Sequence, residues 1–184
     1  RELAARDPSS ARDVVGAAAV GLGWATLETA LPPFTATASA LAQGDQRSAW
    51  GARHPTGVEV TGVVDAILEG ERRGVAAVLA AVDAGVAPDA LLVPVARAAA
   101  VRLTRFDDAW LDRTDAEVGL LDVTHAVTFA EATLALAPLA TPRQQARLAV
   151  IGAGFVGKLR KADRPVDDAR VAAATSAVAG TCAD

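Results

Sequence analysis

RLAVIGAGFVGK, residues 147–158, is the stretch that decides between two folds for this chain. A short apolar run leads into Gly152, Gly154 and Gly157, which have the G-x-G-x-x-G spacing of dinucleotide-binding proteins. That spacing binds a nucleotide only when a β-strand precedes it, a helix follows it and an acidic residue comes about 20 residues later. The flanking residues therefore determine whether the chain is α/β or all-α.

The residues before the motif predict a helix instead of a strand. Thr141 and Gln144 form a capping box, and Pro142 occupies the favoured first helical position. Apolar residues then recur at helical spacing, at Leu148, Ile151, Phe155 and Leu159. The three glycines would thus lie inside a helix, at a cost of about 1 kcal/mol each relative to alanine, where they let a neighbouring helix approach closely. Dinucleotide binding through Gly152–Gly157 remains an alternative.

The rest of the chain also has helical spacing. We expect helices over residues 14–31, ended by two prolines, over residues 35–42, and from Val60 onward with a break at Gly70 and Gly74. A further helix should be strained or kinked at Pro94. The polar, glycine-rich stretch at residues 43–57 predicts a loop and a possible domain boundary. The sequence therefore predicts an all-α bundle of about seven helices, as a single domain over residues 1–184.

Composition excludes several classes of protein. The 184 residues are 52% hydrophobic and 4% aromatic, and the net charge of −4 gives no basic surface for nucleic acid. No apolar run reaches the length needed to cross a bilayer, so we expect no membrane partner and a cytoplasmic location. Cys182 is the only cysteine, which excludes an intrachain disulfide. The chain contains no Met, and we expect it to be a piece of a longer protein.

His125 is the first candidate for chemistry. Thr114 and Glu117 form another capping box, which predicts a helix that starts near Asp115 and carries one inward stripe. The stripe consists of Val118, Leu121, His125, Phe129, Ala132 and Leu136. Asp122 lies three residues before His125 on the same face. The imidazole is therefore expected to point inward, where it packs with a hydrogen bond to Asp122 or Thr128, lines a pocket or transfers a proton.

The pair Asp122 and His125 is also half of the pattern that holds a di-iron centre. The chain has one other histidine, His54, which precedes a proline in the predicted loop, so the second half of that pattern is missing. We therefore expect no bound metal. The large aromatic residues Trp24 and Trp50 are predicted to fill the core, and Trp50 could instead line a pocket.

Two motifs resemble a known family. DVTHAVTFA at residues 122–130 and FVGKLRK at residues 155–161 resemble the helical domain of a bacterial family related to questin oxidase, often found in longer chains with a Rieske-type [2Fe–2S] domain. The resemblance implies a repeat-like all-α bundle associated with oxidation chemistry, in which Asp122 and His125 match an Asp/His helix motif. Trp24 stands where the family has a further histidine. The C-x-H and C-x-x-H ligands of a Rieske cluster are missing, so no cofactor is expected on this chain alone.

These observations together predict a helical domain of an oxidoreductase-type protein that binds a small organic substrate beside His125. The predicted catalytic residues are His125 and Asp122, and the predicted substrate-binding residues are Trp24, Phe129 and Trp50. The alternative is a non-catalytic scaffold or interaction domain that holds a partner redox domain. The dinucleotide-binding protein is the second alternative.

Overall fold

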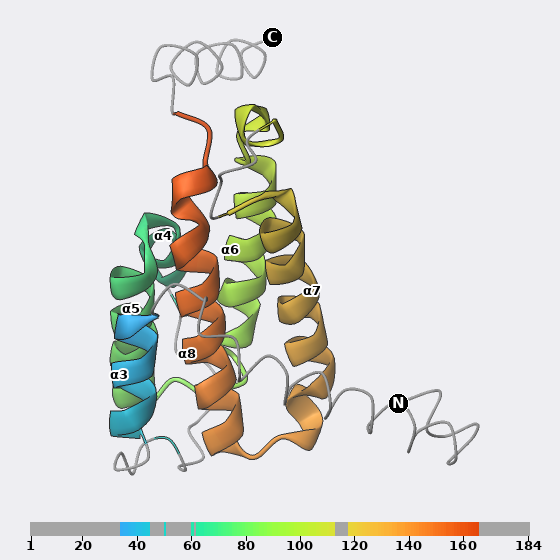
Figure 1. Ribbon diagram of the computed structural model, residues 1–184. Helices are drawn as coiled ribbons and strands as arrows, with labels where there is room; N and C mark the ends of the chain where they lie inside the picture. Colours follow the sequence, from blue (N-terminus) through green and yellow to red (C-terminus); the bar gives the residue numbers. More distant parts are fainter. Residues whose placement is uncertain (1–33, 45–49, 51–59, 61, 113–117, 166–184) are drawn as a thin grey trace, which may run out of the picture. The chain divides into compact units, whose positions relative to one another are not determined.

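The computed structural model describes residues 34–44, 50, 60, 62–112 and 118–165 (Figure 1). Over these residues the chain forms six α-helices and no β-strand, which confirms the all-α fold class. The chain divides into two compact units, residues 1–33 and residues 34–184, and every described residue belongs to the second. The helix predicted over residues 14–31 lies outside the described residues, and the single domain over residues 1–184 stays a prediction.

The six α-helices are joined by short connections and three 3₁₀ turns. The α-helices are α3 (Thr35–Gly44), α4 (Val63–Glu69), α5 (Glu71–Asp83), α6 (Leu92–Thr104), α7 (Leu120–Leu136) and α8 (Pro142–Lys158). The 3₁₀ turns are η2 (Asp108–Trp110), η3 (Ala137–Leu139) and η4 (Leu159–Ala162). The short helix expected over residues 35–42 is confirmed as α3.

Helix α8 is the centre of the bundle and contacts each of the other five α-helices (Figure 1). Its predicted start is confirmed. The Gln144 backbone N–H donates to Thr141 Oγ1 at 3.3 Å, the Thr141 backbone N–H donates to Gln144 Oε1 at 2.8 Å, and Pro142 is the first helical residue. The G-x-G-x-x-G stretch is therefore helical, and no strand precedes it within the described segment 118–141.

The three glycines of α8 face three different neighbours. A methyl group at Gly152 would lie 2.6 Å from Val95 of α6, and one at Gly154 would overlap a side chain of α3. At Gly157 it would lie 2.6 Å from the backbone where α4 meets α5. The motif that resembles a phosphate-binding loop is thus a packing motif, which lets one helix approach neighbours on several sides.

Helix α7 differs from its prediction in both its start and its buried face. It begins at Leu120, after extended backbone at Gly119, and not near Asp115; the capping box of Thr114 and Glu117 lies outside the described residues. The buried residues of α7 are Val123, Ala126, Ala130 and Thr133. Most of the predicted stripe is exposed, at Leu121 (67%), His125, Ala132 and Leu136, whereas Val118 is buried and Phe129 is half-buried. Small alanines face the neighbouring helices because they allow close packing.

Two predictions about helix breaks are corrected in part. Gly70 does separate α4 from α5, and its φ of 139° suits glycine alone. Gly74, however, lies inside α5, where it packs against the backbone of Ile67. Pro94 lies in the first turn of α6, where its missing N–H would have had no helical partner, so the expected kink does not arise.

Candidate functional site

The predicted site around His125 is not assembled as expected. The imidazole was expected to point inward, but His125 is exposed on α7. Asp122 is a capping residue, because its Oδ2 accepts a hydrogen bond of 2.8 Å from the Gly119 backbone N–H. The Thr128 hydroxyl donates to backbone carbonyls of its own helix. The inward orientation was therefore wrong, and the catalytic roles of His125 and Asp122 stay predictions.

The predicted aromatic contacts of a substrate are dispersed. Trp50 is wholly buried, and its indole ring fills the space over Gly44 where a side chain would otherwise lie. Phe129 is half-buried and packs edge-to-face against Phe155, with ring centroids 6.2 Å apart. Trp24, like His54 and Cys182, lies outside the described residues. The substrate contacts of these aromatic residues stay predictions.

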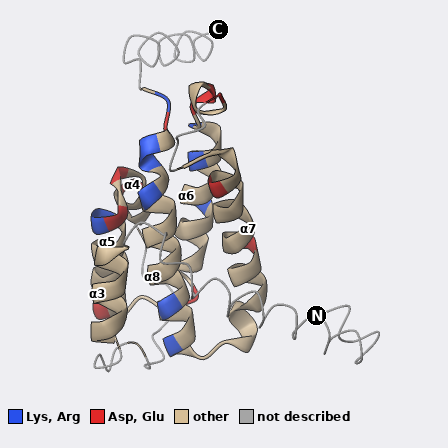
Figure 2. Ribbon diagram, in the orientation of Figure 1, with Lys and Arg blue, Asp and Glu red and all other residues tan. Residues whose placement is uncertain are grey.

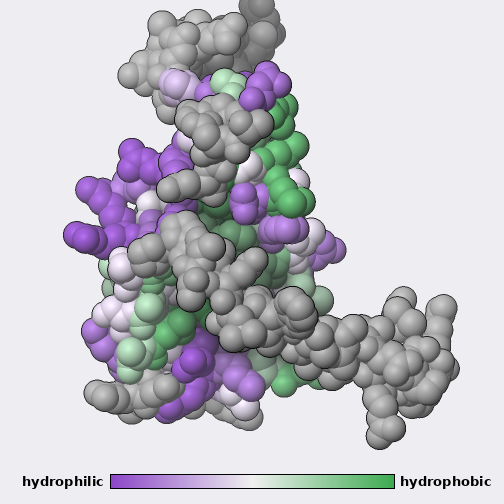
Figure 3. All heavy atoms as spheres, viewed as in Figure 1, coloured by the Kyte–Doolittle hydropathy of each residue, from purple (hydrophilic) through white to green (hydrophobic). Residues whose placement is uncertain are grey.

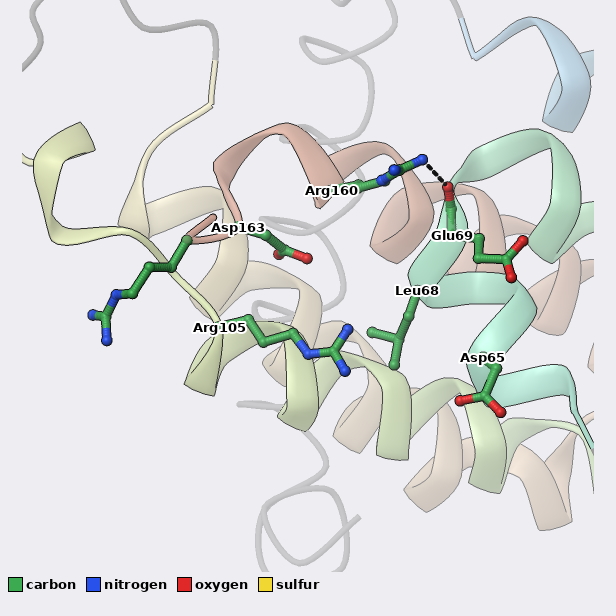
Figure 4. Close-up of a pocket in the computed structure, with 7 residues that line it drawn as sticks. Asp65, Leu68, Glu69, Arg105, Arg160 and Asp163 are labelled. Carbon is green, nitrogen blue, oxygen red and sulfur yellow. Dashed lines mark hydrogen bonds between the residues drawn. The ribbon is translucent and has the colours of Figure 1, made fainter. Parts of the chain in front are cut away.

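A polar cavity lies at the end of the bundle where α4, α6 and η4 meet. It has a volume of about 490 Å³, and we call it the arginine pocket. Its lining residues are Asp65, Leu68 and Glu69 of α4, Arg105 at the end of α6, and Arg160, Asp163 and Arg164 of η4 and the segment after it. Figure 4 shows the Arg105 side chain extending toward Leu68, with Asp65 beyond it on α4.

Arg102, a wholly buried residue of α6, binds the elements that form the arginine pocket to one another. Its guanidinium forms an ion pair with the Asp163 carboxylate. It also donates to the backbone carbonyls of Ile67 at 3.3 Å and Leu68 at 2.9 Å, near the end of α4. The last carbonyls of a helix lack helical donors and carry partial negative charge. The Ile67 carbonyl also accepts the Gly70 backbone N–H at 3.2 Å, so Arg102 supplies a donor to the Leu68 carbonyl and a second donor to that of Ile67, and it connects α4, α6 and the segment after η4.

Backbone hydrogen bonds fix the segment after α8 against the end of α6. The Asp107 N–H donates to the Ala162 carbonyl at 2.9 Å, and the Arg164 N–H donates to the Arg105 carbonyl at 2.6 Å. This pairing is an isolated antiparallel bridge between Phe106 and Asp163. It brings arginines from sequence positions about sixty residues apart to one end of the bundle (Figure 2).

Most charges of the arginine pocket have a partner. Asp163 is paired with Arg102, Glu69 with Arg73 on the next helix, and Arg164 with Asp108 at 3.2 Å. Arg160 donates to the Glu69 backbone carbonyl at 2.8 Å (Figure 4) and forms no direct ion pair with a described carboxylate, although its charge acts on Asp163. Among the described residues, neither the Arg105 guanidinium nor the Asp65 carboxylate has a hydrogen-bond or ion-pair partner. The charges of Arg105 and Arg160 act on the Asp163 carboxyl without a direct ion pair, and Asp65 is the lining carboxylate with no direct partner among the described residues.

Burial is the main influence on the ion pair behind the pocket. It raises the pKa of the Asp163 carboxyl, although the charge of Arg102 acts in the opposite direction. Burial likewise lowers the pKa of Arg102, which Asp163 opposes. Asp163 Oδ1 and Arg102 Nε are buried and have no hydrogen-bond partner in the described structure. Such atoms usually bind water or a ligand group.

The raised pKa of Asp163 predicts a specific pH dependence. Because the folded state binds this proton more tightly, the stability contributed by Asp163 is fully present below its ordinary pKa of 3.8 and is lost as pH rises through the folded-state pKa. We expect the free energy of unfolding of the wild type, relative to Asp163→Asn, to fall between acidic and neutral pH. Urea unfolding of both chains across this range measures the difference. A difference that rises with pH would show that pairing with Arg102 outweighs burial.

The sequence did not lead us to the arginine pocket, although it contained one signal. Val95, Ala98 and Arg102 lie at helical spacing in an apolar segment, which predicts that Arg102 is on the buried face of α6. Among the described residues, no group of three or more His, Cys, Asp or Glu side chains is placed to hold a metal ion. Comparisons of the chain with protein-family models, with curated proteins and with solved structures find no match.

Proposed function

We propose that this helical domain binds a small organic anion in the arginine pocket. The observation that supports the proposal is the Arg105 guanidinium, which borders a cavity and has no partner among the described residues. Arg160 adds a second positive charge that forms no direct ion pair with a carboxylate of the described residues. An anion that enters the pocket would pair with both groups.

The residues that line the arginine pocket restrict the chemical class of the ligand. Guanidinium groups bind carboxylates and phosphates through two parallel hydrogen bonds, which favours these anions over spherical ones. A volume of about 490 Å³ lies within the range of small-molecule sites, about 300–1,000 Å³. Asp65 can accept a hydrogen bond from a hydroxyl or amino group of the ligand, and Leu68 offers an apolar contact. A hydroxy- or amino-substituted carboxylate or phosphate ester fits these requirements.

This proposal keeps the predicted small organic ligand but places it away from His125. The arginine pocket is formed by α4, α6 and the segment after α8, whereas His125 is on α7. The oxidoreductase activity and the partner redox domain implied by the family resemblance stay predictions. Binding in the arginine pocket requires neither of them.

The test is a titration of the whole chain with defined probes. Phthalate and glycerol 3-phosphate supply the two anionic groups, and benzamide and benzylamine are neutral and cationic controls. We expect both anions to bind with millimolar or tighter affinity, less tightly at higher salt, as measured by calorimetry and by amide chemical shifts. Arg105→Gln should lower the affinity for both anions by about tenfold or more, since a charged hydrogen-bond partner is removed.

Arg97→Gln is the matched control, because Arg97 is an exposed arginine of α6 outside the arginine pocket. It should leave the affinity unchanged. Equal binding of benzamide and phthalate, or equal losses in the two variants, would overturn the proposal. Chemical shift changes that cluster at residues outside the pocket would do so as well.

A further inference from the structure

Asp163 is the most enclosed of the carboxylates that line the arginine pocket. Its side chain is 17% exposed, whereas Asp65 and Glu69 of α4 are exposed residues. Figure 3 shows hydrophilic residues gathered on the surface where α4 ends and α5 begins. Figure 4 shows the Asp163 carboxylate directed toward α4, between the side chains of Arg160 and Arg105. An anion held by these two arginines therefore comes close to Asp163.

The two oxygens of the Asp163 carboxylate have different surroundings. Oδ2 accepts a hydrogen bond from Arg102, whereas Oδ1 is buried and has no hydrogen-bond partner in the described structure. A proton on Oδ1 removes the negative charge, whose burial is costly, and leaves Oδ2 as an acceptor. Asp163 can thus become neutral without breaking its hydrogen bond to Arg102.

Charged groups from several elements surround Asp163. Those that line the pocket or pair with it are Asp65 and Glu69 of α4, Arg102 and Arg105 of α6, Arg160 of η4, and Arg164, while Arg73 of α5 and Asp108 of η2 pair with Glu69 and Arg164. The positive charges of Arg102, Arg105 and Arg160 lower the pKa of Asp163, but burial raises this pKa by more. None of the lining residues is His or Cys, the side chains that ordinarily titrate nearest to neutral pH.

A bound anion shifts this balance toward the protonated carboxyl. An anion on Arg105 and Arg160 neutralises part of the positive charge that these two residues direct at Asp163. Its own negative charge lies in the same cavity of about 490 Å³, within about one Debye length of the carboxylate, about 8–10 Å. Like charges at such distances in a partly buried site repel, and one of the two groups then binds a proton more readily.

The number of charges favours a doubly charged ligand. The groups named above comprise five arginines and four carboxylates when Asp163 is ionised, which leaves one excess positive charge. A single negative charge on the ligand matches this excess. A dianion is matched only when Asp163 is neutral. Binding of a dianion and binding of a proton should therefore favour each other.

We infer that the arginine pocket binds a small organic dianion, such as a phosphate monoester or a dicarboxylate, together with one proton that Asp163 takes from solvent. This inference rests on the proposed function, since it concerns the same pocket. The new O–H bond forms at Oδ1, the oxygen without a partner, while Arg102 keeps its bond to Oδ2. Affinity is highest in mildly acidic solution and falls as pH rises through the pKa that Asp163 has in the complex.

The test measures proton uptake separately from anion binding. 1,3-Benzenedisulfonate is the doubly charged probe and benzenesulfonate the singly charged one, because sulfonates stay ionised and any pH dependence then belongs to the protein. Calorimetry of the whole chain from about pH 4.5 to 8, in buffers of different ionisation enthalpy, counts the protons bound with each anion. We expect the disulfonate to bind about tenfold more tightly at the acidic end, with up to one proton taken up. The monosulfonate should show a smaller change.

Two variants assign the proton to one residue. Asp163→Asn should bind the disulfonate with the same affinity across the pH range, and at pH 8 about tenfold more tightly than the wild type, since the amide carries no charge. Asp65→Asn is the matched control, because it removes an exposed carboxylate of the same pocket and should keep the proton uptake. Circular dichroism melts confirm that each variant is folded, and the proton count on the wild type needs neither of them.

The outcomes distinguish this inference from the proposed function. Disulfonate binding that is equally tight at every pH overturns the inference and leaves the anion pocket standing. Proton uptake that persists in Asp163→Asn, or that is equal for the two sulfonates, does the same. If neither these sulfonates nor phthalate and glycerol 3-phosphate bind at any pH, the proposed function is overturned as well.

Discussion

Arg102→Met is expected to lower the free energy of unfolding by about 3–5 kcal/mol, which is the usual cost of removing one partner of a buried ion pair. The change leaves the Asp163 carboxylate without its partner, and it leaves the Ile67 and Leu68 carbonyls without their side-chain donor. Methionine fills most of the same volume, so the loss reports the polar interactions more than a cavity. Urea unfolding at neutral pH measures the effect.

Two comparison chains isolate the cause. Arg97→Met, at an exposed position of the same helix, should change stability by about 0.5 kcal/mol at most. Adding Asp163→Asn to Arg102→Met removes the unpaired charge and should restore part of the loss, while the Leu68 carbonyl remains without its side-chain donor. If Arg102→Met were no more destabilising than Arg97→Met, the ion pair would contribute nothing to the stability of the packing of α4, α6 and the segment after η4.

The course of α8 could be predicted from the sequence because several local signals agree there. A capping box, a proline at the first helical position and apolar residues at helical spacing all indicate one start. The face of α7 could not be predicted in the same way. Its sequence is apolar on almost every side, so periodicity does not distinguish the buried face from the exposed one. The small residues Ala126 and Ala130 are buried, whereas the larger Leu121 is not.

The arginine pocket could not be predicted from the sequence, for a different reason. Its residues come from three segments, and Arg102 and Asp163 are 61 positions apart. Spacing within one helix could identify Arg102 as buried, but only the packing of α4 against α6 determines which carbonyls it meets. Arg105 and Asp65 carry no local pattern at all. They matter because, among the described residues, neither side chain has a hydrogen-bond or direct ion-pair partner.

Gly157→Val is expected to lower the free energy of unfolding by about 3 kcal/mol, at the upper end of the usual cost of overpacking. A Cβ at this position would lie 2.6 Å from the backbone atoms of Gly70 and Glu71, and backbone cannot move aside as a flexible side chain can. Helix propensity does not account for the loss, since valine is slightly more favourable than glycine in a helix. Thermal or urea unfolding measures the change.

Ala76→Val is the control for the β-branched side chain, because Ala76 is exposed in the middle of α5. It should cost about 0.6 kcal/mol from helix propensity alone. The difference between the two variants then measures how closely α8 is held against the turn between α4 and α5. If Gly157→Val were as stable as Ala76→Val, that turn would be free to move away from α8. The presence of glycine at these positions of α8 would then need an explanation other than close helix packing.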